Sequence, residues 1–196
     1  MIGIWPLLLV ALLAQGAGGS STKVERLFER GKTFQQFLDG VSAQRELWLR
    51  TEAAVTIAPD LLEHAKKSGR GVQLLVVAED WCPDSVYTLP YVARLAEGAG
   101  IPLRVFDRKT GAALMDAHRT RDGRTATPTI VLLRDSRDVG AWVERPAALQ
   151  EMFFSMSTNP ESARRFSQRQ EWYESDGGRT VLKEVLALIE QTRAKE

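Results

Sequence analysis

One segment constrains the fold of this chain more than any other: an apolar run that leads to its single cysteine. Val72–Ala78 (VQLLVVA) is a continuous apolar stretch of strand length, rich in β-branched residues. Such runs are typical of a central strand that is buried on both faces. Residues 79–90 follow directly and read EDWCPDSVYTLP. Because Pro83 suits the first turn of a helix, the sequence predicts a strand, then Cys82, then a helix over residues 83–97.

The predicted position of the cysteine has a chemical consequence. Free backbone N–H groups and the positive end of the helix dipole converge at a helix N-terminus. A thiolate is stabilised there, and thiols in such positions can ionise between ~pH 3.5 and ~pH 7.5 instead of near ~pH 8.5. Asp84 acts in the opposite direction, because a nearby carboxylate disfavours a second negative charge. The sequence leaves open which of the two effects on Cys82 is larger.

Apolar periodicity and turn signals divide the rest of the chain into further elements. Thr33 and Gln36 form a capping-box pair that begins a helix running to about Arg50, with Gly40 as a break. Helical crossovers between the early strands imply parallel pairing, and a late hairpin implies an antiparallel edge. The fold class is therefore α/β, with a mixed central sheet and helices on both faces. Further helices are predicted over 59–68, 111–119, from 146 and through the charged tail 160–196, and further strands over 103–106, 129–133 and 139–143.

The cysteine segment resembles the active site of the thioredoxin-like superfamily. Trp81 and Cys82 follow a hydrophobic strand, and Pro90 stands eight residues after the cysteine, as in thioredoxins. Thr127-Pro128, before a predicted strand, resembles the cis-proline loop of the same superfamily. The resemblance implies a thioredoxin-like fold with extra N- and C-terminal helices. It also implies that Pro128 faces Cys82 and that the backbone of Thr127 pairs with an extended substrate.

More closely, the chain is similar to a bacterial subgroup of thioredoxin-like proteins. These share an added N-terminal helical segment, a Glu-Asp-Trp-Cys-x-Asp active site and a Trp-x-x-Arg-Pro segment, which stand here at 79–84 and 142–146. The resemblance covers about residues 23–156. Together with the residue patterns on either side, it divides the chain into a signal peptide or short N-terminal anchor over 1–20, a thioredoxin-like domain with its helical extension over 21–157, and a C-terminal helical extension over 158–196.

Two departures from the thioredoxin pattern limit the chemistry. Ser85 replaces the second cysteine, which in dithiol thioredoxins releases the reduced substrate, and Val76 replaces the buried acid that serves it. The resemblance therefore implies a monothiol Cys-Pro-Asp-Ser variant. Cys82 would form a mixed disulfide with a protein or with a small thiol such as glutathione, and an external thiol would resolve it. The rim of that active site would comprise Trp81, Pro83, Asp84 and Ser85.

Other interpretations of the same residues remain open. A degenerate thioredoxin fold that binds an extended peptide and catalyses nothing is favoured by Ser85. A disulfide between two copies of Cys82 would give a reductant-sensitive dimer. Arg121 and Arg124 precede the proline loop, and these cations either stabilise the thiolate or hold a substrate carboxylate. Alternatively, they belong to a solvated basic loop.

Composition excludes several classes of function. Lys and Arg number 26 and Asp and Glu 25, which gives a net charge of +1 and no basic surplus for a nucleic-acid partner. One cysteine and two distant histidines make no recognisable metal site, and no cofactor is expected. The lone cysteine also cannot close a disulfide within the chain.

The N-terminal residues bear on localisation. Residues 1–14 carry no charged side chain and are followed by small residues. This apolar run is shorter than the ~20 residues of a membrane span and fits a secretory signal peptide. We therefore expect an exported protein, periplasmic or extracellular, if the segment is cleaved. Membrane association is expected only if it is an uncleaved anchor, and a cytoplasmic location if it is neither.

Overall fold

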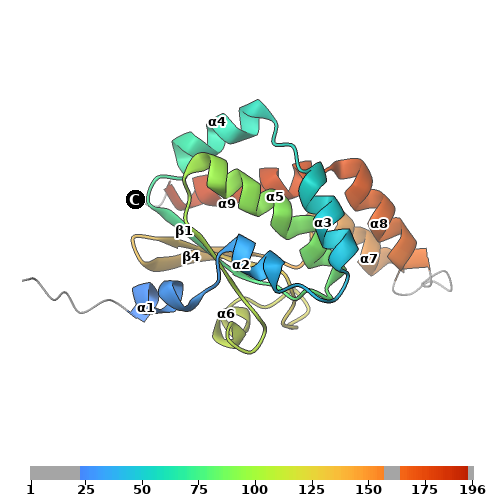
Figure 1. Ribbon diagram of the computed structural model, residues 1–196, viewed down its shortest axis with the longest axis horizontal. Coiled ribbons are helices and arrows are strands. Elements are labelled where there is room, and N and C mark those ends of the chain that lie inside the picture. Colours follow the sequence, from blue (N-terminus) through green and yellow to red (C-terminus); the bar gives the residue numbers. More distant parts are fainter. Residues whose placement is uncertain (1–22, 157–163, 194–196) are drawn as a thin grey trace, which may run out of the picture.

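The computed structural model describes residues 23–156 and 164–193. Within these ranges, a four-stranded sheet carries helices on both faces (Figure 1). The predicted signal peptide or anchor lies outside the described residues. The elements are α1 (Lys23–Arg30), α2 (Phe34–Asp39), α3 (Arg45–Ala54), α4 (Pro59–Ser68), β1 (Val72–Val77), α5 (Pro83–Ala99), β2 (Leu103–Phe106), α6 (Ala112–Ala117), β3 (Thr129–Arg134), β4 (Arg137–Val143), α7 (Ala147–Met156), α8 (Arg165–Asp176) and α9 (Arg179–Arg193).

The strands lie in the order β2–β1–β3–β4, so the apolar run β1 is an inner strand, as predicted. β1 pairs with β2 in parallel, while β3 runs antiparallel to both β1 and β4. The predicted hairpin is confirmed. Its turn residues Asp135 and Ser136 both have positive φ, 49° and 61°, as the favoured two-residue hairpin turns require.

The register between β1 and β3 positions the two segments that the sequence singled out. Val77 at the end of β1 pairs with Thr129 at the start of β3. The loop after β1, which contains Cys82, and the loop before β3, which contains Pro128, therefore meet at one edge of the sheet. The helical crossover before β3 thus leads to an antiparallel strand, and the implied parallel pairing holds for β1 and β2 alone.

Each face of the sheet has its own apolar core, because alternate strand residues point to opposite faces. The larger core lies under α3, α4, α5 and α9, and the smaller core lies under α1 and α6 (Figure 1). Fully buried side chains of the larger core include Trp48, Leu74, Val76, Leu89, Ile130, Leu132, Leu149, Leu182 and Ile189. The smaller core is formed by Leu75, Val77, Phe106, Met115, Val131 and Leu133, with Leu27 and Phe28 packed on it.

The C-terminal region is part of the larger core. The apolar stripe of α9 is at most 1% exposed and comprises Val181, Leu182, Val185, Leu186 and Ile189. This helix packs on α4, α5 and β4. Arg134, buried at the end of β3, donates to the carbonyl oxygens of Arg70 at 3.0 Å and Ile189 at 3.4 Å. In the described part of the chain, no helix is both long and apolar enough to span a membrane.

The predicted capping box at Thr33 is confirmed, because the Thr33 side chain accepts from the Gln36 backbone and the Gln36 side chain accepts from the Thr33 backbone. The predicted helix to Arg50 is two helices, α2 and α3, that Gly40 and the following turn separate. Gln44, the N-cap of α3, has a φ of 53°, a conformation that changes the direction of the chain. This turn contacts the segment before Cys82.

Candidate active site

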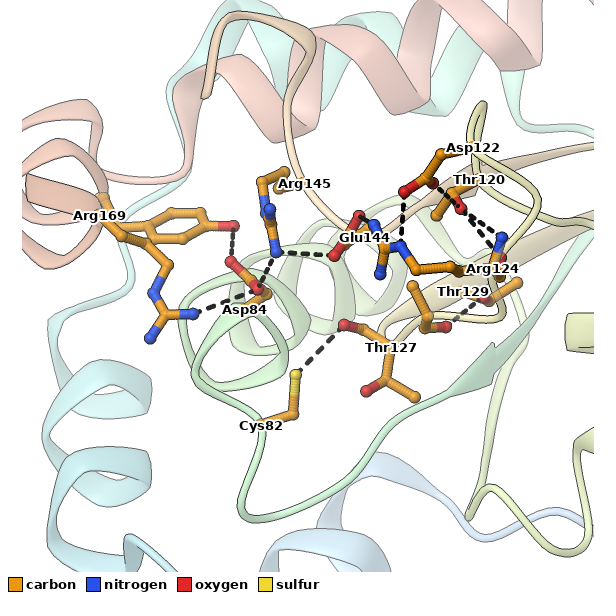
Figure 2. Close-up of polar contacts among 12 residues, drawn as sticks. Cys82, Asp84, Thr120, Asp122, Arg124, Thr127, Thr129, Glu144, Arg145 and Arg169 are labelled. Carbon is orange, nitrogen blue, oxygen red and sulfur yellow. Dashed lines mark hydrogen bonds and ion pairs between the residues drawn. The ribbon is translucent and has the colours of Figure 1, made fainter. Parts of the chain in front are cut away.

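Cys82 lies at the junction that the sequence predicted. It is the N-cap of α5, and Pro83 is the first residue of that helix. The Cys82 side chain is close to fully buried, with the residue 6% exposed. Its Sγ donates to the carbonyl oxygen of Thr127 at 3.2 Å (Figure 2). The structure thus brings the sulfur against the residue that precedes Pro128.

The proline loop opposite the sulfur is held by its own hydrogen bonds. The Thr127–Pro128 peptide bond is cis. The Thr129 hydroxyl donates to the carbonyl oxygen of Ala126 at 2.7 Å. The carbonyl oxygen of Pro128 accepts from the backbone N–H of Glu144 at 2.8 Å. The loop is therefore fixed to the start of β3 and to the residues that follow β4.

The residue before Trp81 ties the cysteine loop to the α2–α3 turn. The Oδ2 atom of Asp80 accepts from the backbone N–H groups of Ser42 at 3.0 Å and Ala43 at 2.9 Å. The Trp48 indole donates to the carbonyl oxygen of Asp80 at 2.8 Å. Burial raises the pKa of Asp80. The hydrogen bonds from Ala43 and Ser42 lower it, and together the hydrogen bonds outweigh burial, so the pKa lies below the ordinary 3.8. A carboxylate that accepts backbone donors favours its charged form.

Trp81, the residue before Cys82, lies on the surface. Its carbonyl oxygen accepts from the Gln44 side chain at 2.6 Å, which fixes the backbone. Its residue is 54% exposed, although large aromatic residues are highly buried on average. The ring therefore offers an exposed apolar surface one residue before Cys82.

Asp84 was expected at the rim of the site, with its charge opposing the thiolate. The structure buries it, with only 3% of the residue exposed. Its carboxylate accepts from Arg145 Nη2 at 3.0 Å and from Tyr173 Oη at 3.0 Å, and Arg169 Nη1 lies at 3.5 Å (Figure 2). Two guanidinium groups thus compensate the negative charge, and its repulsion of a thiolate at Cys82 is weakened accordingly.

Sequence reasoning missed two of these three partners of Asp84. Arg169 and Tyr173 both lie on α8, outside the part of the chain that the resemblance covers. Arg145 belongs to the quoted Trp-x-x-Arg-Pro segment, which was the one available signal. Burial, and secondarily the charge of Asp84, raise the pKa of Tyr173 well above 10, so its phenol stays protonated and donates. The Tyr173 ring also stacks on Tyr87 of α5, with centroids 5.1 Å apart.

From Asp84 the polar contacts continue to the proline loop, as Figure 2 shows. Arg145 Nη2 lies 2.7 Å from Glu144 Oε1, and Arg124 Nη2 lies 3.2 Å from Glu144 Oε2. Arg124 Nε in turn donates to Asp122 Oδ2 at 2.6 Å. The network therefore joins the N-terminus of α5 to the loop before Pro128.

The arginines predicted to act on the thiolate are engaged elsewhere. Arg124 is paired with Asp122 and Glu144. Arg121 lies 3.7 Å from Glu151, and its side chain is 85% exposed. In the part of the chain that the structure describes, both predicted cations thus pair with carboxylates rather than with Cys82.

Ser85, one turn beyond Cys82, is fully buried. Within the described residues its hydroxyl has no hydrogen-bond partner. A hydroxyl cannot attack a mixed disulfide as the missing cysteine would. Among residues 23–156 and 164–193, no group of three His, Cys, Asp or Glu side chains could hold a metal ion.

Comparison with known proteins agrees with this geometry. Two solved structures share the fold. One is a protein of unknown function from Pseudomonas aeruginosa, with 23% identity, a TM-score of 0.66 and coverage of 87% of this chain and 98% of that chain. The other is an HIV epitope-scaffold, with 21% identity, a TM-score of 0.64 and coverage of 85% of this chain and 96% of that chain. A search of curated proteins finds no significant match. A family model described as thioredoxin matches residues 31–164, from before α2 to the start of α8. Because this match spans most of the chain, the protein belongs to the thioredoxin family.

Proposed function

We propose that this protein exchanges thiols and disulfides through Cys82 by a monothiol route. One observation carries the proposal: the only cysteine of the chain is the N-cap residue of α5, and its Sγ lies 3.2 Å from the carbonyl oxygen of Thr127. That carbonyl immediately precedes the cis bond to Pro128. A substrate segment that pairs with this loop would bring its own sulfur to Cys82.

The reaction would proceed in two exchanges. The Cys82 thiol first loses its proton to solvent, and the helix N-terminus stabilises the resulting thiolate. The thiolate attacks one sulfur of a substrate disulfide, whose S–S bond breaks as the Cys82–substrate disulfide forms, and the departing thiolate takes up a proton. A second, external thiol then attacks the mixed disulfide and restores Cys82. The substrate disulfide is the oxidant and the external thiol is the reductant.

The surroundings of the sulfur support this route in two ways. Asp84, two residues after Cys82, pairs with Arg145 and Arg169, so its negative charge is compensated. Ser85 cannot resolve the intermediate, so the mixed disulfide would persist until an external thiol arrives. We therefore expect the glutathionylated or substrate-linked form to accumulate when reducing thiols are scarce.

A non-catalytic peptide-binding protein is the second candidate. It is favoured by the low exposure of Cys82 and by the bond from its Sγ to Thr127, because a carbonyl oxygen accepts from a thiol and not from a thiolate. In that case the proline loop and Trp81 would bind an extended segment without covalent chemistry.

Intact-protein mass spectrometry separates the two candidates. The reduced protein is incubated with glutathione disulfide and then with excess reduced glutathione. The exchange proposal predicts one added glutathionyl group that the second step removes, and none on Cys82→Ser. A folded protein that stays unmodified, while the urea-unfolded protein is modified, would instead support the binding candidate.

A further inference from the structure

Arg108 lies between the two loops that flank Cys82, at the carboxyl end of β2. Its backbone N–H donates to Glu79 Oε1 at 2.7 Å, and Glu79 precedes Cys82 by three residues. Its guanidinium Nη2 donates to the Thr125 hydroxyl at 3.2 Å, and Thr125 lies two residues before Thr127. The half-buried Arg108 is thus tied to the cysteine loop and to the proline loop at once.

The charge of Arg108 differs from that of the other arginines near the site in having no counter-ion. Arg124, Arg145 and Arg169 each pair with a carboxylate through the guanidinium. Among residues 23–156 and 164–193, no carboxylate pairs with the guanidinium of Arg108. The Glu79 carboxylate accepts from the backbone N–H of Arg108 instead. A guanidinium has five N–H donors, so Arg108 retains free donors in the fork geometry that recognises carboxylates.

The reach from this cation to the sulfur suits a short substrate segment. Thr127 lies two residues after Thr125, so their Cα atoms are at most about 7 Å apart. With one hydrogen bond at each end, the guanidinium lies within roughly 15 Å of the sulfur, which is at most about four extended residues. A carboxylate within a few residues of a substrate sulfur can therefore reach Arg108 while that sulfur contacts Cys82.

We infer that Arg108 selects substrates by binding a carboxylate close to the reactive sulfur. This inference rests on the proposed function and names its substrate class: disulfides that carry a nearby carboxylate. Glutathione disulfide and peptide disulfides with an acidic residue beside the cysteine share that chemistry. Arg108 thereby takes the carboxylate-binding part that the sequence suggested for Arg121 and Arg124.

Rates of mixed-disulfide formation with matched probes test the inference. The probes are glutathione disulfide, the ester in which all four of its carboxyl groups are ethylated, and two C-terminally amidated peptide disulfides that differ only by Glu or Gln next to the cysteine. For Arg108→Gln, we expect the rates with glutathione disulfide and the Glu peptide to fall about five- to thirtyfold, as for a lost charge-assisted hydrogen bond. The rates with the ester and the Gln peptide should stay within about twofold, a change of less than ~0.5 kcal/mol. Arg108→Lys should retain part of the preference, and the control Arg121→Gln all of it.

The outcomes distinguish the inference from the function on which it rests. Exchange with every probe at rates that Arg108→Gln leaves unchanged would overturn the inference and leave the function standing. An effect confined to glutathione or to the peptide would identify the source of the carboxylate. If no probe exchanges, calorimetric binding of S-methylglutathione to Cys82→Ser, with and without Arg108→Gln, decides: binding that needs Arg108 supports the carboxylate site, and its absence overturns it.

Discussion

At the scale of single residues, Asp84 is the most deeply buried charged residue in the described part of the chain. Its carboxylate faces Arg145, Arg169 and the Tyr173 phenol, and its side chain is 5% exposed. Asp84→Ala would remove the carboxylate that Arg145, Arg169 and the Tyr173 phenol share, so we expect the free energy of unfolding in urea to fall by about 3–5 kcal/mol. The control Glu63→Ala removes an exposed partner of Lys66 and should change it by less than about 0.5 kcal/mol. Similar small effects for both variants would contradict the buried network.

Asp80 gives the site a predictable response to acid. Because its folded pKa lies below 3.8, its contribution to stability is complete above the unfolded pKa and is lost as the pH falls through the folded pKa. Asp80→Asn should therefore destabilise the protein at neutral pH, by roughly 1 kcal/mol for exchanged hydrogen bonds of a partly exposed group. Urea unfolding across the pH range should show this difference vanish in acid below the folded pKa. A difference that stays constant down to that range would refute the assignment.

The candidate site was predictable as far as local sequence reaches. Cys82, Thr127 and Pro128 could be predicted as site residues because a strand-to-helix junction and a pre-strand loop each have a local sequence signature. The partners of Asp84 on α8 could not be predicted, because nothing local to Arg169 or Tyr173 marks them as facing residue 84. Arg121 and Arg124 were selected for their charge, and only the fold shows that Glu151, Asp122 and Glu144 pair with them.

At the scale of elements, α9 makes the C-terminal region part of the domain. Leu186 is 1% exposed in the larger core. Leu186→Ala should lower the free energy of unfolding by about 2–5 kcal/mol, through lost burial and the cavity left behind. The control Leu49→Ala removes a leucine of α3 that is 43% exposed, and it should cost less than about 1 kcal/mol. Equal costs would mean that α9 packs only loosely.

Helix α8 contacts α5 through the ring of Tyr173 and through the hydrogen bond from its hydroxyl to Asp84. A single substitution can remove the hydrogen bond and keep the ring. Tyr173→Phe keeps the stack on Tyr87 but removes the donor to the buried Asp84 carboxylate. We expect a loss of about 1–3 kcal/mol in urea unfolding, the cost of an unmade bond to a buried charged group. The matched variant Tyr91→Phe tests a phenol that makes no such contact with Asp84. Equal losses for the two variants would show that the hydrogen bond from the Tyr173 hydroxyl to Asp84 does not add to the free energy of unfolding.

The sequence predicted which segments are helices and which are strands better than it predicted how they are arranged. Buried runs and turn residues are local, so the strands, the hairpin and the helix after Cys82 were predicted correctly. The direction of β3 depends on how the chain after β2 returns to the sheet. The presence of a helix before β3 does not determine whether the strand runs parallel or antiparallel to β1. Likewise, the turn between α2 and α3 is held by Asp80, a contact across 37–38 residues of chain.

At the scale of the whole molecule, one edge of the sheet assembles the site from distant segments. The end of β1, the loop before β3, the residues after β4 and helix α8 all meet around the N-terminus of α5 (Figure 2). This arrangement buries the polar network and leaves the sulfur at the boundary between the helix and the proline loop. We therefore propose that the fold serves as a scaffold that activates one sulfur.

The most direct test of that claim is the alkylation rate of Cys82 at about pH 7, measured in the folded protein and in the same protein unfolded in urea. Since the chain has one cysteine, the reaction reports a single sulfur. An unperturbed thiol is only a few per cent ionised there, so a stabilised thiolate should make the folded protein react several-fold faster than the unfolded one. A folded protein that reacts more slowly would show that Cys82 is a buried, inert side chain and would contradict the proposed exchange.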